Sequence, residues 1–101
     1  MKLSKTGEDF RKTYPPVRSI SYAIEAMTRY IQVDINQDQF DTLVSFICHL
    51  GEEVFASSIV LKALNQGNYI QAGNNFEYVG RMTGTESLRR KEGALFNGIY
   101  N

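Results

Sequence analysis

Three groups of side chains in this sequence are of types that can do chemistry. The first is a set of carboxylates, Glu8, Asp9 and Glu25, in the amino-terminal part of the chain. Hydrolysis of a glycosidic bond usually takes two carboxyl groups on opposite sides of the bond, one of them held protonated. No spacing pairs these three acids at a defined distance, so we interpret them as charges on solvated helix faces.

The second group is the adjacent pair Cys48 and His49. Neighbouring side chains on a helix point about 100° apart, whereas a nucleophile and its base must be in hydrogen-bond contact. We therefore expect Cys48 to be a small buried residue and His49 to lie near a helix end. Cys48 is the single cysteine, so it has no disulfide partner within the chain. No Cys/His cluster has zinc-site spacing, and we expect neither a metal nor a cofactor.

The third group is the basic run Arg89, Arg90 and Lys91. The whole chain has 11 basic and 11 acidic residues, whereas a protein that binds nucleic acid through its phosphates usually has a basic excess. Nucleic acid is therefore not an expected partner. Two interpretations of the run stay open: structural or solvated positions on a helix, or a contact with a phosphate or an acidic partner.

Helices must position these groups, because apolar residues recur at helical spacing through most of the chain. Pro15 and Pro16 end a first short helix near Thr13, since proline lacks an amide donor and restricts the residue before it. Asn36 and Gln39 form the capping box of the most periodic segment. Its apolar positions, which should be buried together before the terminating Gly51, are Phe40, Leu43, Val44, Ile47 and Leu50.

The expected helices lie at residues 4–13, 19–31, 36–50, 57–67, 68–76 and 85–96. Gly93 should weaken the last of them by about 1 kcal/mol relative to alanine. No segment alternates with period two between turn signals, so no sheet is expected. We predict an all-α fold: a compact bundle of about six helices, forming one domain over residues 1–101 with a single modest core.

The amino-terminal residues and the hydropathy pattern bear on location. A signal peptide needs an apolar segment of about 7–15 residues, and polar residues follow Met1–Lys5 instead. No run approaches the roughly 20 apolar residues of a membrane span. We therefore expect a cytoplasmic protein with no membrane partner.

Several segments carry a family resemblance. Residues 35–46, Ile-Asn-Gln-Asp-Gln-Phe-Asp-Thr-Leu-Val-Ser-Phe, resemble nearly residue for residue the helix Q-x-Q-F-D-A-L-V-S-F of the phage-type lysozymes, endolysins that cleave the glycan chains of peptidoglycan. Residues 55–69 and 87–96 resemble the next helix pair and the closing helix of that family. The resemblance extends over residues 1–13 and 34–97, and it implies the helical lobe of a phage lysozyme.

The resemblance also implies a departure at the catalytic motif. In that family a glutamate follows the first helix, and an aspartate and a threonine come after it. The register places Pro15 and Pro16 where the family has Glu-Gly, and no acid occurs between Asp9 and Glu25. The hairpin lobe that carries the aspartate and threonine has no counterpart before the helix that starts near Ser19. We therefore expect no catalytic residues and no enzyme activity.

The resulting hypothesis is a binding protein. We expect a non-catalytic phage or prophage protein, in the cytoplasm of the bacterial host cell, that binds and inhibits another macromolecule such as a host defence or lysis component. The alternatives are a peptidoglycan-binding competitor and a decayed endolysin remnant. A protein partner is expected, and a second copy of the chain is another candidate. The candidate partner-binding residues are of types enriched at hot spots or in the basic run: Tyr14, Arg18, Tyr22, Arg29, Tyr30, Arg89, Arg90 and Lys91.

Overall fold

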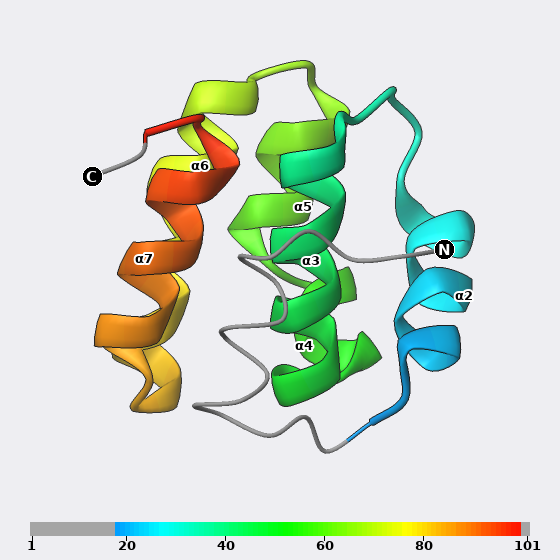
Figure 1. Cartoon of the computed structure of the whole chain (residues 1–101), viewed down its shortest axis with the longest axis horizontal. Helices are drawn as coiled ribbons and strands as arrows, with labels where there is room; N and C mark the ends of the chain where they lie inside the picture. The colour runs from blue at the N-terminus through cyan, green and yellow to red at the C-terminus, as the bar shows by residue number, and fades with distance from the viewer. Residues whose placement is uncertain (1–17, 100–101) are drawn as a thin grey trace.

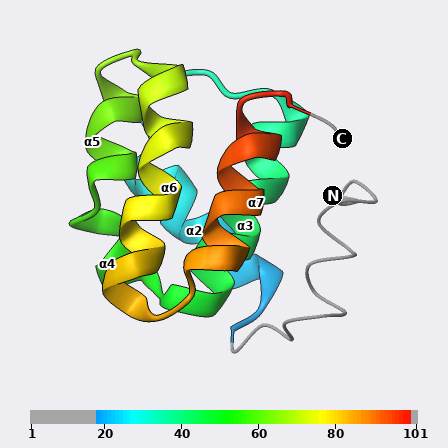
Figure 2. The same ribbon diagram turned by 90° about the vertical axis from the view of Figure 1, so that its left-hand side faces the viewer.

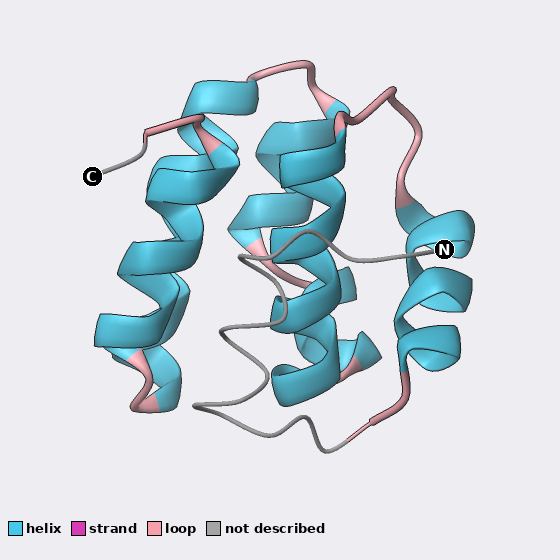
Figure 3. Cartoon of the chain, viewed as in Figure 1, coloured by secondary structure: helices cyan, strands magenta, loops and turns pink. Residues whose placement is uncertain are grey.

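The computed structural model describes residues 18–99, and this range contains six α-helices and no strand (Figures 1 and 3). The all-α prediction is therefore confirmed, whereas the helix predicted at residues 4–13 lies outside the described residues. No helix of the described range is long and apolar enough to cross a membrane. The helices are α2 (Ile20–Tyr30), α3 (Gln37–Leu50), α4 (Glu52–Ala56), α5 (Ile59–Asn65), α6 (Tyr69–Thr83) and α7 (Glu86–Phe96).

Helix α3 begins at the capping box that the sequence predicts. The Gln39 amide donates to Oδ1 of Asn36 over 2.8 Å, and the Asn36 amide donates to Oε1 of Gln39 over 2.9 Å. These two bonds satisfy backbone donors that the first turn of a helix leaves without intrahelical partners. Gly51 ends the helix with φ 92°, a backbone conformation that glycine adopts without a steric penalty.

Helix α3 stands between two groups of helices. Helix α2 packs on one side of it, and the pair α6–α7 lies on the other side, with α7 directly against α3 (Figure 1). Helices α6 and α7 run side by side as a hairpin and make the most extensive contact of the molecule (Figure 2). Because α3 meets both groups, every residue from Asp41 to Cys48 is buried.

The core forms around α3, as predicted, with one correction. Leu43, Val44 and Ile47 are completely buried, whereas Phe40 and Leu50 are only half-buried and pack at the edge of the cluster. These two residues lie at the ends of the helix, where fewer neighbours cover them. Each fully buried side chain of this size stabilises the fold by about 1.5–3 kcal/mol relative to an exposed one.

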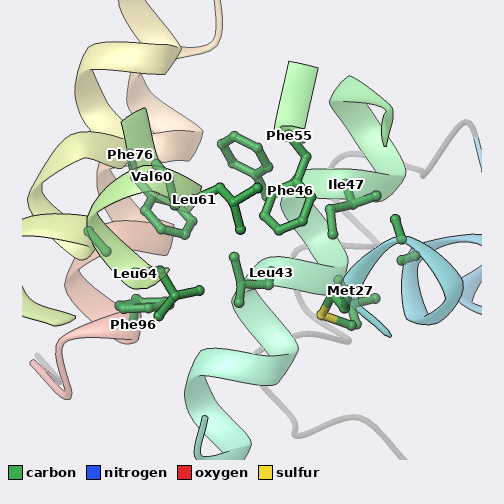
Figure 4. Close-up of a cluster of buried hydrophobic side chains, with 14 of the residues drawn as sticks. Met27, Leu43, Phe46, Ile47, Phe55, Val60, Leu61, Leu64, Phe76 and Phe96 are labelled. Atoms are coloured by element: carbon green, nitrogen blue, oxygen red, sulfur yellow. The ribbon is translucent and has the colours of Figure 1, made fainter. Parts of the chain in front are cut away.

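Aromatic rings connect the helices across this core (Figure 4). The ring of Phe46 on α3 lies 6.2 Å from that of Phe55 on α4 and 5.3 Å from that of Phe76 on α6. The Phe76 ring in turn lies 5.3 Å from the ring of Phe96 on α7. Edge-to-face and tilted pairs of this kind add to the stabilisation from burial alone. They hold four helices in register around one apolar centre.

Candidate functional site

The first group of candidate residues lies where α2 meets the junction of α3 and α4. The Arg18 guanidinium donates weakly to the carbonyls of Cys48 and His49, at 3.5 and 3.4 Å, and lies 5.7 Å from the centre of the Tyr22 ring. The Tyr22 hydroxyl accepts the backbone N–H of Glu52 over 2.8 Å. Arg18 therefore satisfies carbonyls at the end of α3, and Tyr22 satisfies the first amide of α4.

Two further candidates lie along the same helix. Arg29, with 53% of its side chain exposed, forms an ion pair with Glu52. Tyr30 is half-buried, with its ring edge-on to Phe55 at 6.4 Å, and its carbonyl accepts a hydrogen bond from Nδ2 of the Asn65 side chain over 2.9 Å. Tyr14 lies outside the described residues. The structure thus brings Arg18, Tyr22 and Arg29 together around the start of α4, and their binding of a partner stays a prediction.

The basic run on α7 divides between two environments. Arg89 is completely buried, whereas Arg90 is 59% exposed and Lys91 is exposed. Arg90 donates to Glu77 over 2.7 Å and to Glu86 over 2.9 Å. This pairing lowers the pKa of the Glu77 carboxyl and raises that of the Arg90 guanidinium. Adjacent side chains on a helix point in different directions. Arg90 therefore joins an ion-pair network on the surface, whereas Arg89 places its charge in the interior.

A buried polar cluster on α3 and α7 was not among the sequence predictions. The Nε of Arg89 lies 2.7 Å from Oε1 of Glu92, and neither side chain has exposed surface. Burial raises the pKa of Glu92 to about 7, although Arg89 and the Ser45 hydroxyl each offset part of that rise. The spacing in the sequence could have indicated this pair, because an arginine and a glutamate three residues apart share one helix face. The sequence did not indicate that this face is buried.

Cys48 and His49, the other residues with metal-binding or nucleophilic chemistry, lie at the end of α3. The buried Cys48 thiol donates weakly to the Ser19 carbonyl oxygen over 3.5 Å, and Nδ1 of the half-buried His49 lies 2.8 Å from the Ser45 carbonyl oxygen. Among residues 18–99 there is no group of three or more His, Cys, Asp or Glu side chains that could hold a metal ion.

Comparison with known families identifies the scaffold. The family model described as phage lysozyme matches residues 16–93. The chain belongs to the phage lysozyme family. The match takes in all six described helices except the last turn of α7.

Relatives agree with this assignment, and a solved structure shares the fold. The endolysin of Salmonella phage P22 is 34% identical over 82 residues, which are 76% of this chain and 56% of that protein. The endolysin of Bacillus phage B103 is 40% identical over 53 residues, 52% of this chain and 20% of that protein. A crystal structure of a P22 lysozyme variant superposes with a TM-score of 0.79 at 19% identity, covering 96% of this chain and 99% of that one. The aligned part of the chain spans about half the length of the P22 endolysin. It spans less than a third of the length of the two Bacillus phage endolysins.

These findings correct two sequence-based expectations. The expectations that the chain is not an enzyme and that it is a non-catalytic inhibitor are wrong, because its relatives are endolysins, which are enzymes. Both depended on reading Pro15 and Pro16 as the loss of a catalytic glutamate, and on the missing counterpart of the hairpin lobe. Those positions lie outside the described residues, so the structure supplies no geometry for that interpretation. The family match over residues 16–93 is stronger evidence about the protein than the departure at Pro15 and Pro16.

Proposed function

We propose that the chain acts on peptidoglycan as an endolysin, in the hydrolysis of its glycan strands. The observation that carries this proposal is the family match over residues 16–93. Two endolysin relatives, at 34% and 40% identity, support the same substrate class. The fold shared with the P22 lysozyme variant supports a common helical scaffold.

Solvent access limits which described carboxylates could contact a glycan. Glu92 is enclosed, so its carboxyl has no path to a glycosidic oxygen. Glu77 and Glu86 are held by ion pairs with Arg81 and Arg90. General acid–base hydrolysis takes a carboxyl group within hydrogen-bond reach of the substrate. Among residues 18–99, exposed acids outside that network include Glu25 on α2 and Glu53 on α4, and we would test these two first.

The test measures new reducing ends released from purified peptidoglycan by the full chain. We expect release above that of heat-unfolded protein, and a loss of release in Glu25→Gln or Glu53→Gln if either acid takes part in the reaction. Lys62→Gln, a substitution at another exposed helical position, is the matched control and should leave release unchanged. The absence of new reducing ends at every pH from 5 to 8, with the protein folded, would sink the proposal.

A further inference from the structure

Helix α7 ends at the residue pair Asn97 and Gly98, and the fold itself calls for glycine at the second position. Gly98 has a φ of 77°, a left-handed conformation that glycine adopts without a steric penalty. Its N–H donates to the Leu95 carbonyl over 3.0 Å, and the Ile99 N–H donates to the Ala94 carbonyl over 2.8 Å. These are the two bonds of a Schellman motif, which satisfies carbonyls at the end of a helix. The geometry of this helix end therefore places a glycine directly after Asn97.

The Asn97 side chain fastens the end of α7 to the start of α6, which lie side by side (Figure 1). Its Nδ2 donates to the Ile70 carbonyl over 3.3 Å and to Oδ1 of Asn74 over 3.2 Å. Its Oδ1 is buried, and a Cβ atom added to Gly73 would lie only 2.2 Å from that oxygen. The Asn97 amide group thus lies directly against the backbone of α6 and presents a donor to it.

Asparagine followed by glycine is the pair most prone to deamidation, because glycine has no side chain to obstruct the reaction. Asn97 and Gly98 are the single such pair in the sequence. The backbone nitrogen of Gly98 attacks Cγ of Asn97, the Cγ–Nδ2 bond breaks, and the side-chain nitrogen leaves as ammonia with the proton of the backbone amide. Water then adds to one of the two carbonyl carbons of the resulting succinimide, and the ring C–N bond at that carbon breaks. The product is aspartate or isoaspartate, with one water gained and one ammonia lost.

The folded helix end restrains this reaction without preventing it. The Gly98 nitrogen can attack only when its N–H no longer donates to Leu95, and the Asn97 amide must leave its acceptors on α6. Both changes occur when the last turn of α7 frays, and helix ends open locally at little cost in free energy. Gly98 is exposed, and a cavity of about 340 Å³ between α6 and α7, which Asn97 helps to line, brings water to the side chain.

We propose that Asn97 is a deamidation site, at which conversion of the amide to a carboxylate releases the end of α7 from α6. The product has no donor for the Ile70 carbonyl oxygen and faces it with a negative charge instead. That charge also stands at the negative end of the α7 dipole, where it is unfavourable. Contact with Gly73 removes hydration that a carboxylate needs. The site belongs to the helical scaffold and is independent of the proposed endolysin activity.

Incubation of the folded full chain at pH 8, followed by peptide mass spectrometry, tests the reaction. We expect the peptide containing Asn97 to gain the mass difference between an amide and a carboxyl group. Part of the product should contain isoaspartate, which forms by opening of the succinimide and not by direct hydrolysis of the amide. Peptides that contain Asn68 or Asn75, each followed by an aromatic residue, are internal controls and should change much more slowly. Unfolding in urea should accelerate conversion at Asn97, because it removes the hydrogen bonds of the helix end.

Variants separate the reaction from its structural consequence. Asn97→Gln should keep a constant mass, because glutamine would have to close a larger ring. Asn97→Asp carries the product from the start, and amides in the last turn of α7 should exchange about tenfold faster than in the unmodified protein, as expected for the loss of one or two hydrogen bonds. Asn68→Asp, the same exchange at an exposed residue before α6, should leave those amides unchanged. An unchanged Asn97 peptide from the folded protein, or equal exchange rates in Asn97→Asp and Asn68→Asp, would overturn the proposal.

Discussion

Gly93 on α7 packs tightly against the backbone of α6, so adding a single methyl group there tests the helix packing. A Cβ atom at this position would lie 2.3 Å from the Gly73 carbonyl oxygen and 3.2 Å from Cβ of Phe76. The obstructing oxygen belongs to the backbone of a neighbouring helix, so no side-chain rotation can relieve the contact. Reaching even the tight limit of 3.0 Å requires a displacement of 0.7 Å, the difference between 3.0 and 2.3.

The net effect of Gly93→Ala is a difference between two terms. Overpacking of an interior costs about 1–3 kcal/mol, and we expect the upper end because the α6 backbone must move. Alanine in place of glycine in a helix interior stabilises the helix by about 1 kcal/mol. We therefore expect a net loss of about 2 kcal/mol in the free energy of unfolding, measured by urea denaturation of the full chain. A small domain would lose roughly 10 °C in its thermal midpoint for that change.

The control is Ala94→Gly, the opposite exchange at the next position of α7, which is half-buried. It should cost about 1 kcal/mol through helix propensity alone. If Gly93→Ala instead raises the denaturation midpoint, helix propensity outweighs packing at this site, and the close approach of α6 and α7 is refuted.

Three further substitutions probe the interior, a helix cap and the junction of α2 with α4. Leu43→Ala removes a completely buried side chain and should cost about 2–5 kcal/mol in urea denaturation, and an unmoved midpoint would refute its central place in the core. Asn36→Ala deletes the side-chain half of the α3 capping box and should cost about 1 kcal/mol, with the exposed Lys62→Ala as a control near zero. Tyr22→Phe removes the acceptor of the Glu52 amide and should cost about 1 kcal/mol. A stability equal to that of the unmodified protein would show that this bond contributes nothing.

The sequence was most informative where the determinants of structure are local. The start of α3 depends on Asn36 and Gln39, which interact over one turn, so the capping box was predictable and is present. The apolar spacing of Leu43, Val44 and Ile47 likewise predicted a buried face, and all three side chains are buried. Helical periodicity predicts which face of a helix is covered, because the spacing of residues along a helix does not depend on its partners.

Features that depend on distant contacts were not predictable in the same way. Adjacent positions 89 and 90 both hold arginine, and only the placement of α7 against α3 makes one interior and the other exposed. The interpretation of Gly93 also changed. The sequence indicated a residue that weakens α7, whereas the structure shows that the absence of a side chain there allows α7 to pack closely on Gly73 of α6. The functional prediction was wrong for a related reason: it drew a conclusion about the whole protein from Pro15, Pro16 and the missing counterpart of the hairpin lobe.

The hairpin of α6 and α7 has a consequence for the order of folding. Only Gly84 and Thr85 separate the two helices, whereas the contact between Tyr22 of α2 and Glu52 of α4 joins residues 30 positions apart. Closing a short loop loses less chain entropy than closing a long one, and nearby contacts form faster. We expect the α6–α7 hairpin to be present in the folding transition state and α2 to dock afterwards. Destabilising substitutions in the hairpin should then slow folding, whereas those at the α2 contacts should mainly accelerate unfolding.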